Sequence, residues 1–387
     1  MLQALYNGLS GLLGFSKDLD NIGNNISNMN TPGYRGSSAF FENNVDNEGS
    51  GLSKEFTNTS EGDLEQTGTD TDAAIQGQGM FVLRDQNGTQ YYTRSGHFQF
   101  NADGYLVDDN SGYNVAALNA SGGLTDFSIT PYQTLPPVAT TAVKFTGNLA
   151  PGDTSQKVTG LQVYDASGGV HSLTATLTNN KAVTTGSWLV SVTDESGAVV
   201  GSGEIRFDPS GAITAGYTSM TLHLAYNGST QAVALSFGTA GAFNGTTQIN
   251  GAASSIGGKV ADGHGVIGIS SYAYDDAGNL QITYTDGETK QGPQLALADV
   301  ADEQQLQLHE GAMYVAPPGL SVNYGKASDA KFGSITGGSL ESSNVDLTTE
   351  LTQMIIVQRG YQASSRVLTV TDAMLQQLYS ATGGGGG

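Results

Sequence analysis

The feature that most constrains this chain is a seven-residue repeat of apolar side chains at each of its ends. Near the N-terminus the repeat falls on Leu5, Leu12, Leu19 and Ile26, and near the C-terminus on Leu347, Met354, Tyr361, Leu368 and Leu375. Such a repeat places apolar side chains on one side of an α-helix and is typical of helices that pair along their length. We therefore predict two amphipathic helices that pair, and we assign these residues as the candidate interaction residues of the chain.

The ends of both predicted helices carry recognisable signals. Residues 30–33 (Asn-Thr-Pro-Gly) follow the first repeat and stop a helix, because proline lacks the amide donor. Before the second repeat, Asn344 or Asp346 can accept hydrogen bonds from the free amides of the first turn. At ~1.5 Å per residue the helices are expected to be roughly 40 and 55 Å long, which lets them lie along each other.

Between the ends, the sequence has the pattern of β-hairpins. Asn-Gly and Asp-Gly pairs, the preferred two-residue hairpin turns, begin at Asn87, Asp103, Asn227, Asn244, Asn250, Asp262 and Asp286. Alternating apolar residues predict strands, among them residues 80–84, 91–94, 173–177, 188–193 and 280–284. We therefore predict a mainly β fold with a terminal α-helical coiled-coil domain, in which two β domains are nested between the paired N- and C-terminal helices.

Shifts in composition give the expected domain boundaries. Residues 35–72 are polar and rich in Gly, Asn and Thr, and residues 245–265 are rich in Gly, Ala and Ser. We predict a helical inner domain (1–34 and 343–387), an extended connector (35–72), an inner β domain (73–144 and 266–342) and an outer β domain inserted into it (145–265).

The charge balance limits the partners of the chain. It has 15 basic and 36 acidic residues, a net charge of −21, so a nucleic acid would be repelled rather than bound. No apolar run approaches the ~20 residues that span a bilayer, so we expect no membrane insertion. The start of the chain lacks a basic n-region and a small-x-small cleavage site, so we expect no cleaved signal peptide.

Residues that could carry chemistry do not form a recognisable site. The chain has no Cys, and its histidines lie far apart and outside any metal-binding motif, at His97, His171, His223, His264 and His309. Gly263, Gly265 and Gly268 spell G-x-G-x-x-G, but a strand pattern follows them where a phosphate site needs a helix. We therefore predict no catalytic residue, no metal and no cofactor, in a protein that is not an enzyme.

Helix pairing alone leaves the ends of the chain marginally stable. The apolar stripes of two helices bury too little surface to offset the conformational entropy that is lost when both termini become ordered. Further cover has to come from the β domains of the same chain or from neighbouring copies. The terminal position of the stripes favours neighbouring copies, so we expect the ends to fray in a monomer and to order on assembly into a helical homopolymer.

Three groups of residues carry a family resemblance. The first is Asn-Asn-Ile-Ser-Asn-Met-Asn-Thr-Pro-Gly-Tyr at 24–34, and the second is Thr-Asp-Ala-Ala-Ile-Gln-Gly-Gln-Gly-Met-Phe-Val at 71–82, continued by Tyr-Thr-Arg-Ser-Gly at 92–96. The third is Gly-Ser-Leu-Glu-Ser-Ser-Asn-Val-Asp-Leu at 338–347, with Met354, Ile355, Gln358, Arg359, Tyr361 and Gln362 beyond it. Taken in this order, they resemble the signatures of the bacterial flagellar axial family, which comprises rod, hook and hook-associated proteins.

The resemblance implies a structural subunit of the flagellar hook, because the middle of this chain is larger than that of the rod members. It implies assembly into a curved, flexible tube that transmits torque from the motor rod to the filament. It further implies type III export without signal cleavage to an extracellular place in the hook. The implied partners are further copies of the chain, the flagellar rod, the hook cap, the hook–filament junction proteins and the export apparatus.

Two alternatives remain open. Thr-Pro-Gly-Tyr at 31–34 is more typical of rod and hook-associated members, so a rod or hook-associated protein of the same family is the nearer alternative. The frequent Tyr residues suit an exported β-domain adhesin, although the paired terminal repeats have no role in one.

Overall fold

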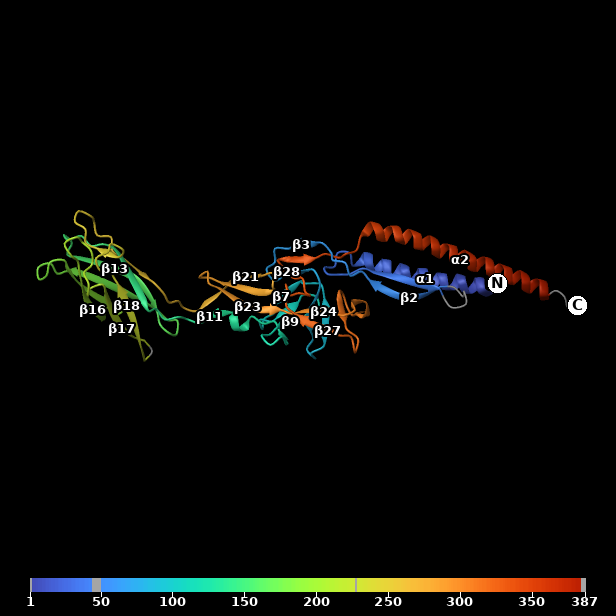
Figure 1. Ribbon diagram of the computed structural model, residues 1–387, viewed down its shortest axis with the longest axis horizontal. Helices are drawn as coiled ribbons and strands as arrows, with labels where there is room; N and C mark the ends of the chain where they lie inside the picture. The colour runs from blue at the N-terminus through green and yellow to red at the C-terminus, as the bar shows by residue number, and fades with distance from the viewer. Residues whose placement is uncertain (1, 44–49, 227, 384–387) are drawn as a thin grey trace. The chain divides into compact units, whose positions relative to one another are not determined.

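The computed structural model describes residues 2–43, 50–226 and 228–383 (Figure 1). The chain divides into two compact units, the first made of Met1–Tyr132, Ser270–Thr283 and Glu288–Gly387, the second of Gln133–Ile269 and Tyr284–Gly287. The second unit is therefore an insertion into the sequence of the first. Strands make up most of the ordered elements, and a long helix stands near each end of the chain, which confirms the predicted fold class.

The first unit contains both long helices. α1 (Leu2–Ser27) and α2 (Leu347–Gly383) lie side by side (Figure 1). Of the two predicted caps, Asp346 is the one that caps α2, because its Oδ1 accepts a hydrogen bond from the amide of Thr349 at 2.7 Å. Asn344 has a different role, since its Oδ1 accepts from the amide of Gly36 at 2.9 Å.

Residues 35–72, which we expected to be an extended connector, contain ordered strands. β1 (Ser37–Asn43) and β2 (Ser50–Thr57) form an antiparallel hairpin, and β3 (Leu64–Gln66) pairs with β29 (Ser339–Glu341). The rings of Phe40 and Phe56 meet edge to face across the hairpin, with centroids 4.8 Å apart. Such cross-strand aromatic pairs stabilise a ladder even where the surrounding composition is polar.

The remaining strands of the first unit form one large sheet and one small one. The large sheet has the strand order β21–β22–β23–β9–β5–β6–β26–β25, with β7, β8, β10, β24 and β27 attached, and β28 pairs separately with β4. The bounds are β4 Ala73–Gln76, β5 Met80–Arg84, β6 Gln90–Thr93, β7 Phe98–Phe100, β8 Leu106–Asp108, β9 Asn114–Leu118, β10 Leu124–Asp126, β21 Ile267–Tyr274, β22 Asn279–Tyr284, β23 Thr289–Leu295, β24 Leu297–Val300, β25 Gln307–Leu308, β26 Met313–Val315, β27 Val322–Gly325 and β28 Ser334–Gly337, with 3-10 turns η2 at Thr130–Tyr132 and η3 at Glu303–Gln305.

The second unit is built around one hydrophobic core between two sheets. One sheet has the order β17–β18–β12–β19 with β20 paired to β12, and the other has the order β13–β14–β15–β16. Trp188 is fully buried in this core, where the rings of Phe145 and Phe237 stack with centroids 4.9 Å apart. The bounds are β11 Thr134–Leu135, β12 Ala142–Asn148, β13 Ser155–Tyr164, β14 Val170–Asn179, β15 Ser187–Thr193, β16 Val199–Arg206, β17 Ser219–Tyr226, β18 Ser229–Ser236, β19 Thr246–Thr247 and β20 Gly257–Val260.

The predicted strands and turns agree closely with these elements. Each predicted strand overlaps a strand of the structure, namely β5, β6, β14, β15 and β22. Most of the predicted turns place their glycine at a positive φ, as a two-residue hairpin turn requires, for example 84° at Gly88 and 88° at Gly287. Gly245 differs, because it has no positive φ and a Cβ there would lie 2.4 Å from the Cα of Gly238. Asn227 lies outside the described residues.

A second turn motif, Asp-x-Ser-Gly, closes several hairpins of the second unit. It begins at Asp165, Asp194 and Asp208, and in each turn the aspartate Oδ1 accepts hydrogen bonds from the serine amide and hydroxyl two residues on. The serine hydroxyl is the main cause that lowers the pKa of each of these carboxyl groups. The ionised aspartate is thus part of the turn geometry.

A buried ion pair lies at the centre of the first unit. Arg94 is fully buried, and its Nε donates to Oε2 of Glu341 at 2.6 Å. Its Nη1 donates to the carbonyls of Gly77 and Gly79 at 2.8 and 2.7 Å, and its Nη2 donates to the carbonyl of Ile75 at 2.9 Å. The guanidinium is therefore paired and hydrogen-bonded, as a buried charge must be.

Glu341 extends this network to the segments beside both helices. Its Oε1 accepts from the amide of Gly62 at 3.1 Å, and its main-chain carbonyl accepts from the amide of Gly33 at 2.7 Å. Gly33 follows α1, and Glu341 precedes α2. One residue therefore ties the end of α1 and the start of α2 to the β strands.

Replacing Glu341 is expected to show how much the first unit depends on this pair. Glu341→Gln keeps the shape of the side chain but leaves the charge of Arg94 buried without a counter-charge, which costs about 3–5 kcal/mol of unfolding free energy. Denaturant unfolding followed by far-UV circular dichroism measures the loss, since the one tryptophan, Trp188, lies in the second unit. The matched control is Glu65→Gln on the exposed strand β3, where we expect a change within about 0.5 kcal/mol. A Glu341→Gln protein as stable as the control would contradict the assignment.

Candidate functional site

The two terminal helices meet along a seam of small residues. A Cβ added at Gly8 would lie 3.1 Å from the side chain of Leu368, and one at Gly11 would lie 2.8 Å from the hydroxyl of Ser364. On the other helix, a Cβ at Gly360 would lie 2.5 Å from the ring of Phe15. As the residue number rises along α1 it falls along α2, so the helices are antiparallel and approach closely where glycine leaves room.

Asn25 joins both helices to the β1–β2 hairpin. Its side chain is 2% exposed, and its Nδ2 donates to the carbonyl of Ser37 at 2.8 Å and to Oε1 of Glu350 at 3.0 Å. Its Oδ1 accepts from the amide of Ser37 at 2.9 Å and from the hydroxyl of Tyr34 at 3.4 Å. Sequence reasoning quoted Asn25 only within a family signature and did not assign this role.

The carboxyl groups between the helices are partly desolvated. Burial raises the pKa of Asp18 and of Glu350, and for Glu350 the hydrogen bond from Asn25 acts in the opposite direction while the charges of Asp18 and Asp346 add to the increase. Because the folded pKa lies above the unfolded value, ionisation opposes pairing as the pH rises through the folded pKa. The pair of helices therefore carries an electrostatic cost at neutral pH.

Of the predicted interaction residues, Leu368 packs in this seam, against Gly8. Among the helix side chains whose burial is described, Ile22 and Val357 are the buried large apolar residues, at 2% and 5% exposed. Seven of the predicted residues are partly buried, namely Leu5, Leu12, Leu19, Ile26, Met354, Leu368 and Leu375. Leu347 and Tyr361 are exposed, at 37% and 41%. The contact of the nine predicted residues with other copies stays a prediction.

Much apolar surface of the helices stays uncovered in the single chain. The exposed apolar residues of α1 include Tyr6, Leu9 and Leu13, and those of α2 include Leu351, Ile355, Ile356, Val367, Val370 and Met374. Many exposed apolar residues on one pair of helices are typical of a site of protein–protein interaction. Neither helix, within the part of the chain that the structure describes, has an apolar stretch long and uncharged enough to cross a membrane.

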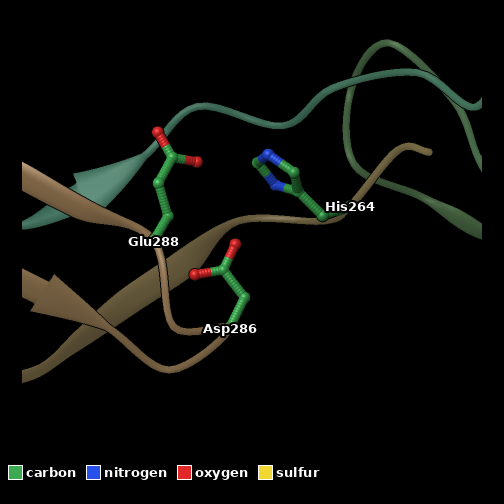
Figure 2. A group of neighbouring side chains, drawn as sticks. All are labelled: His264, Asp286 and Glu288. Carbon is green, nitrogen blue, oxygen red and sulfur yellow. The ribbon is translucent and has the colours of Figure 1, made fainter.

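Among the described residues, one further group of side chains could carry chemistry, and no site is assigned to it. Asp286 and Glu288 project from the turn between β22 and β23, and His264 precedes β21 (Figure 2). The two carboxylates are exposed and the group is divided between the two units, so no metal site is assigned to it. His171 has a structural role, since its Nε2 lies 2.9 Å from Oδ2 of Asp165.

Four stretches of the chain match described protein families. Residues 5–35 match "Flagella basal body rod protein" and residues 74–146 match "Flagellar hook protein FlgE/F/G D1 domain". Residues 137–264 match "Flagellar basal body protein FlaE D2 domain" and residues 336–381 match "Flagellar basal body rod FlgEFG protein C-terminal".

Relatives of nearly the same length share one description, flagellar hook protein FlgE. The protein of Brucella abortus biovar 1 (strain 9-941) is 30% identical, with 93% of this chain and 94% of the relative covered. The protein of Rhizobium meliloti (strain 1021) is 29% identical over 96% and 97% of the two chains. The protein of Salmonella typhimurium (strain LT2) is 28% identical over 96% and 98%.

The fold and these matches together define the class of the protein. A β-rich middle carried between paired terminal helices with uncovered apolar surface is the architecture of a structural subunit that assembles with others. The matched families are those of the flagellar axis. The chain belongs to the flagellar hook protein FlgE family, which confirms the resemblance seen in the sequence. The family is one of structural flagellar proteins rather than enzymes.

Two glycine substitutions are expected to have opposite effects on the helix pair. Gly360→Ala places a methyl group against Phe15 and forces the helices apart, whereas Gly23→Ala meets nothing within 4 Å and gains roughly 1 kcal/mol of helix propensity. We expect the helical circular dichroism signal to be lost at a lower temperature in Gly360→Ala and at a higher temperature in Gly23→Ala. Equal shifts in the two variants would contradict close packing at Gly360.

Proposed function

We propose that this chain polymerises into the curved, flexible tube of the flagellar hook and transmits torque from the motor rod to the filament. The observation that carries the proposal is the helix pair, whose apolar side chains are left uncovered along both α1 and α2. In water such a surface is stabilised by burial against further copies. The function is therefore structural, and its principal partner is the chain itself.

In this proposal the helices line the inner part of the tube. The repeat residues Leu5, Leu12, Leu19, Ile26, Leu347, Met354, Tyr361, Leu368 and Leu375 are the subunit-interaction residues. They are partly buried or exposed in one chain, so each has surface left to lose on assembly. Tight apolar contacts at this level keep the tube closed under load.

The β-rich regions form the outer contacts in the same proposal. We keep the division into an inner β domain (73–144 and 266–342) and an outer inserted domain (145–265). Their composition is polar but weakly charged, since charged residues make up 13% of the whole chain. Small, hydrated contacts between such surfaces can break and form again, which a bending tube requires.

The finer partners follow from the family. We propose that the tube joins the flagellar rod at its base and the hook–filament junction proteins at its tip, and that it grows under a hook cap. We also propose export by the type III apparatus without cleavage of a signal, to an extracellular position. A rod role is disfavoured because the chain spans nearly the full length of hook relatives, 94–98% in the three named above.

Electron microscopy of the purified protein under salting-out conditions tests the proposal. We expect curved or supercoiled tubes. Straight tubes would favour the rod alternative, and particles that never associate would favour the adhesin alternative.

Two charge substitutions in the helices are expected to abolish these tubes. Leu12→Asp and Leu368→Asp each put a carboxylate into surface that assembly has to bury, which is costly without a partner. The thermal unfolding of the second unit is expected to stay unchanged in both. The matched control is Val183→Asp in the second unit, where the native side chain is 79% exposed and tubes are expected to form as in the wild type. Normal tubes from either helix variant would count against the role of the helices.

Amide exchange is expected to differ between monomer and tube at the ends of the chain. In the monomer the amides of α1 and α2 exchange quickly, because the pair alone is marginal, and in the tube they become protected. The amides of β15, the strand that contains the buried Trp188, serve as the internal reference that is protected in both states. Helices that are already protected in the monomer would refute ordering on assembly.

A further inference from the structure

The outer side of α2 carries two arginines among its exposed apolar residues. Gly360, Ser364 and Leu368 face α1. Arg359 and Arg366 are seven residues apart, so they share a face, and the helical period puts that face on the side away from α1. Both are exposed. Their neighbours on this face include Ile355, Ile356 and Val370, which are 54%, 63% and 53% exposed.

The free side of α1 carries the matching set of residues. Gly8, Gly11 and Phe15 face α2, whereas Leu9, Leu13 and Asp20 share a different face, since they are spaced by four and seven residues. Leu9 and Leu13 are 45% and 66% exposed, and Asp20 is exposed as well. One helix therefore presents leucines and a carboxylate, and the other presents apolar residues and guanidinium groups.

These charges lack an ion-pair partner in the described part of their own chain. Over the described residues, no ion pair involves Asp20, Arg359 or Arg366. Asp20 and the two arginines stand on sides of the helix pair that point away from each other, so one copy cannot bring them together. A second copy can.

We propose that the free face of α1 (Leu9, Leu13, Asp20) docks on the outer face of α2 (Ile355, Ile356, Arg359, Arg366, Val370) of a second copy, with Asp20 paired to Arg359. The inference rests on the proposed tube and names a contact within it. In a tube built by head-to-tail addition all copies point the same way, so α1 of one copy runs antiparallel to α2 of the next.

The spacing of the residues selects this register over the alternative. When Asp20 is level with Arg359 in antiparallel helices, Leu13 is level with Arg366 and Leu9 with Val370. Leu13 then covers the aliphatic stem of Arg366, and Leu9 meets an apolar partner. When Asp20 is instead level with Arg366, Leu9 is level with Gln377 and Leu13 with Ala373, so the larger apolar partner Val370 is lost.

Reciprocal charge reversal tests the pairing. Assembly is induced by polyethylene glycol at low ionic strength, because salt screens exposed ion pairs. Asp20→Arg and Arg359→Asp are each expected to raise the critical concentration for tubes about fivefold, since each replaces an attraction by a repulsion. The double variant Asp20→Arg/Arg359→Asp is expected to return to within about twofold of the wild type.

The mismatched double variant Asp20→Arg/Arg366→Asp is the control for register, and it is expected to stay impaired. Rescue by this variant, no rescue by the matched one, or single variants that assemble like the wild type would each overturn the proposal. Circular dichroism of every variant before assembly establishes that the β units are folded. If the wild type itself forms no tubes, the proposed function fails. If the wild type forms tubes and the variants have the same critical concentration, only this contact fails.

Discussion

The ion pair between Arg94 and Glu341 is the interaction on which the rest of the first unit depends. Burying two charges is tolerated only when every donor and acceptor finds a partner, and here the partners are the turns and strands that the pair holds together. The main-chain carbonyl of Glu341 also accepts a hydrogen bond from the amide of Gly33. The segment that follows α1 and the segment that precedes α2 therefore meet the β strands at the same point. The helices are therefore linked to the sheet through a short, hydrogen-bonded route.

The same junction gives a physical reason for the Thr-Pro-Gly-Tyr motif. Gly33 has a φ of 69°, and a Cβ there would lie 2.2 Å from the amide nitrogen of Ser95. Only glycine fits both the conformation and the approach. Tyr34 then reaches back to Asn25, which holds Glu350 of α2. A motif quoted for its resemblance is thus the place where both helices attach to the β strands.

Sequence patterns predicted the helices, the hairpin strands and the fold class, because these follow from local periodicity and turn chemistry. They did not predict how the helices meet. The repeat at Leu5 and Leu12 marks an apolar stripe. The helices approach each other on a neighbouring side, where Gly8, Gly11 and Gly360 lie. The three-residue spacing of Gly8 and Gly11 was the available signal, whereas Gly14 lies against Phe41 of β1. Arg94 and Asn25 were beyond prediction, since nothing local indicates that a polar side chain will be enclosed by segments from across the sequence.

The separation between an ordered β region and marginal helices gives the chain two different kinds of contact. The β-rich regions have their own buried cores, since Trp188 and Arg94 are each buried within a single unit. They can therefore move against neighbouring copies without losing their own stability. The helices have a narrow seam, partly desolvated carboxylates and wide uncovered apolar surface, and in the proposed tube neighbouring copies would cover that surface. A polymer of such subunits would be held together where its parts are least stable alone. It would remain compliant where they are most stable.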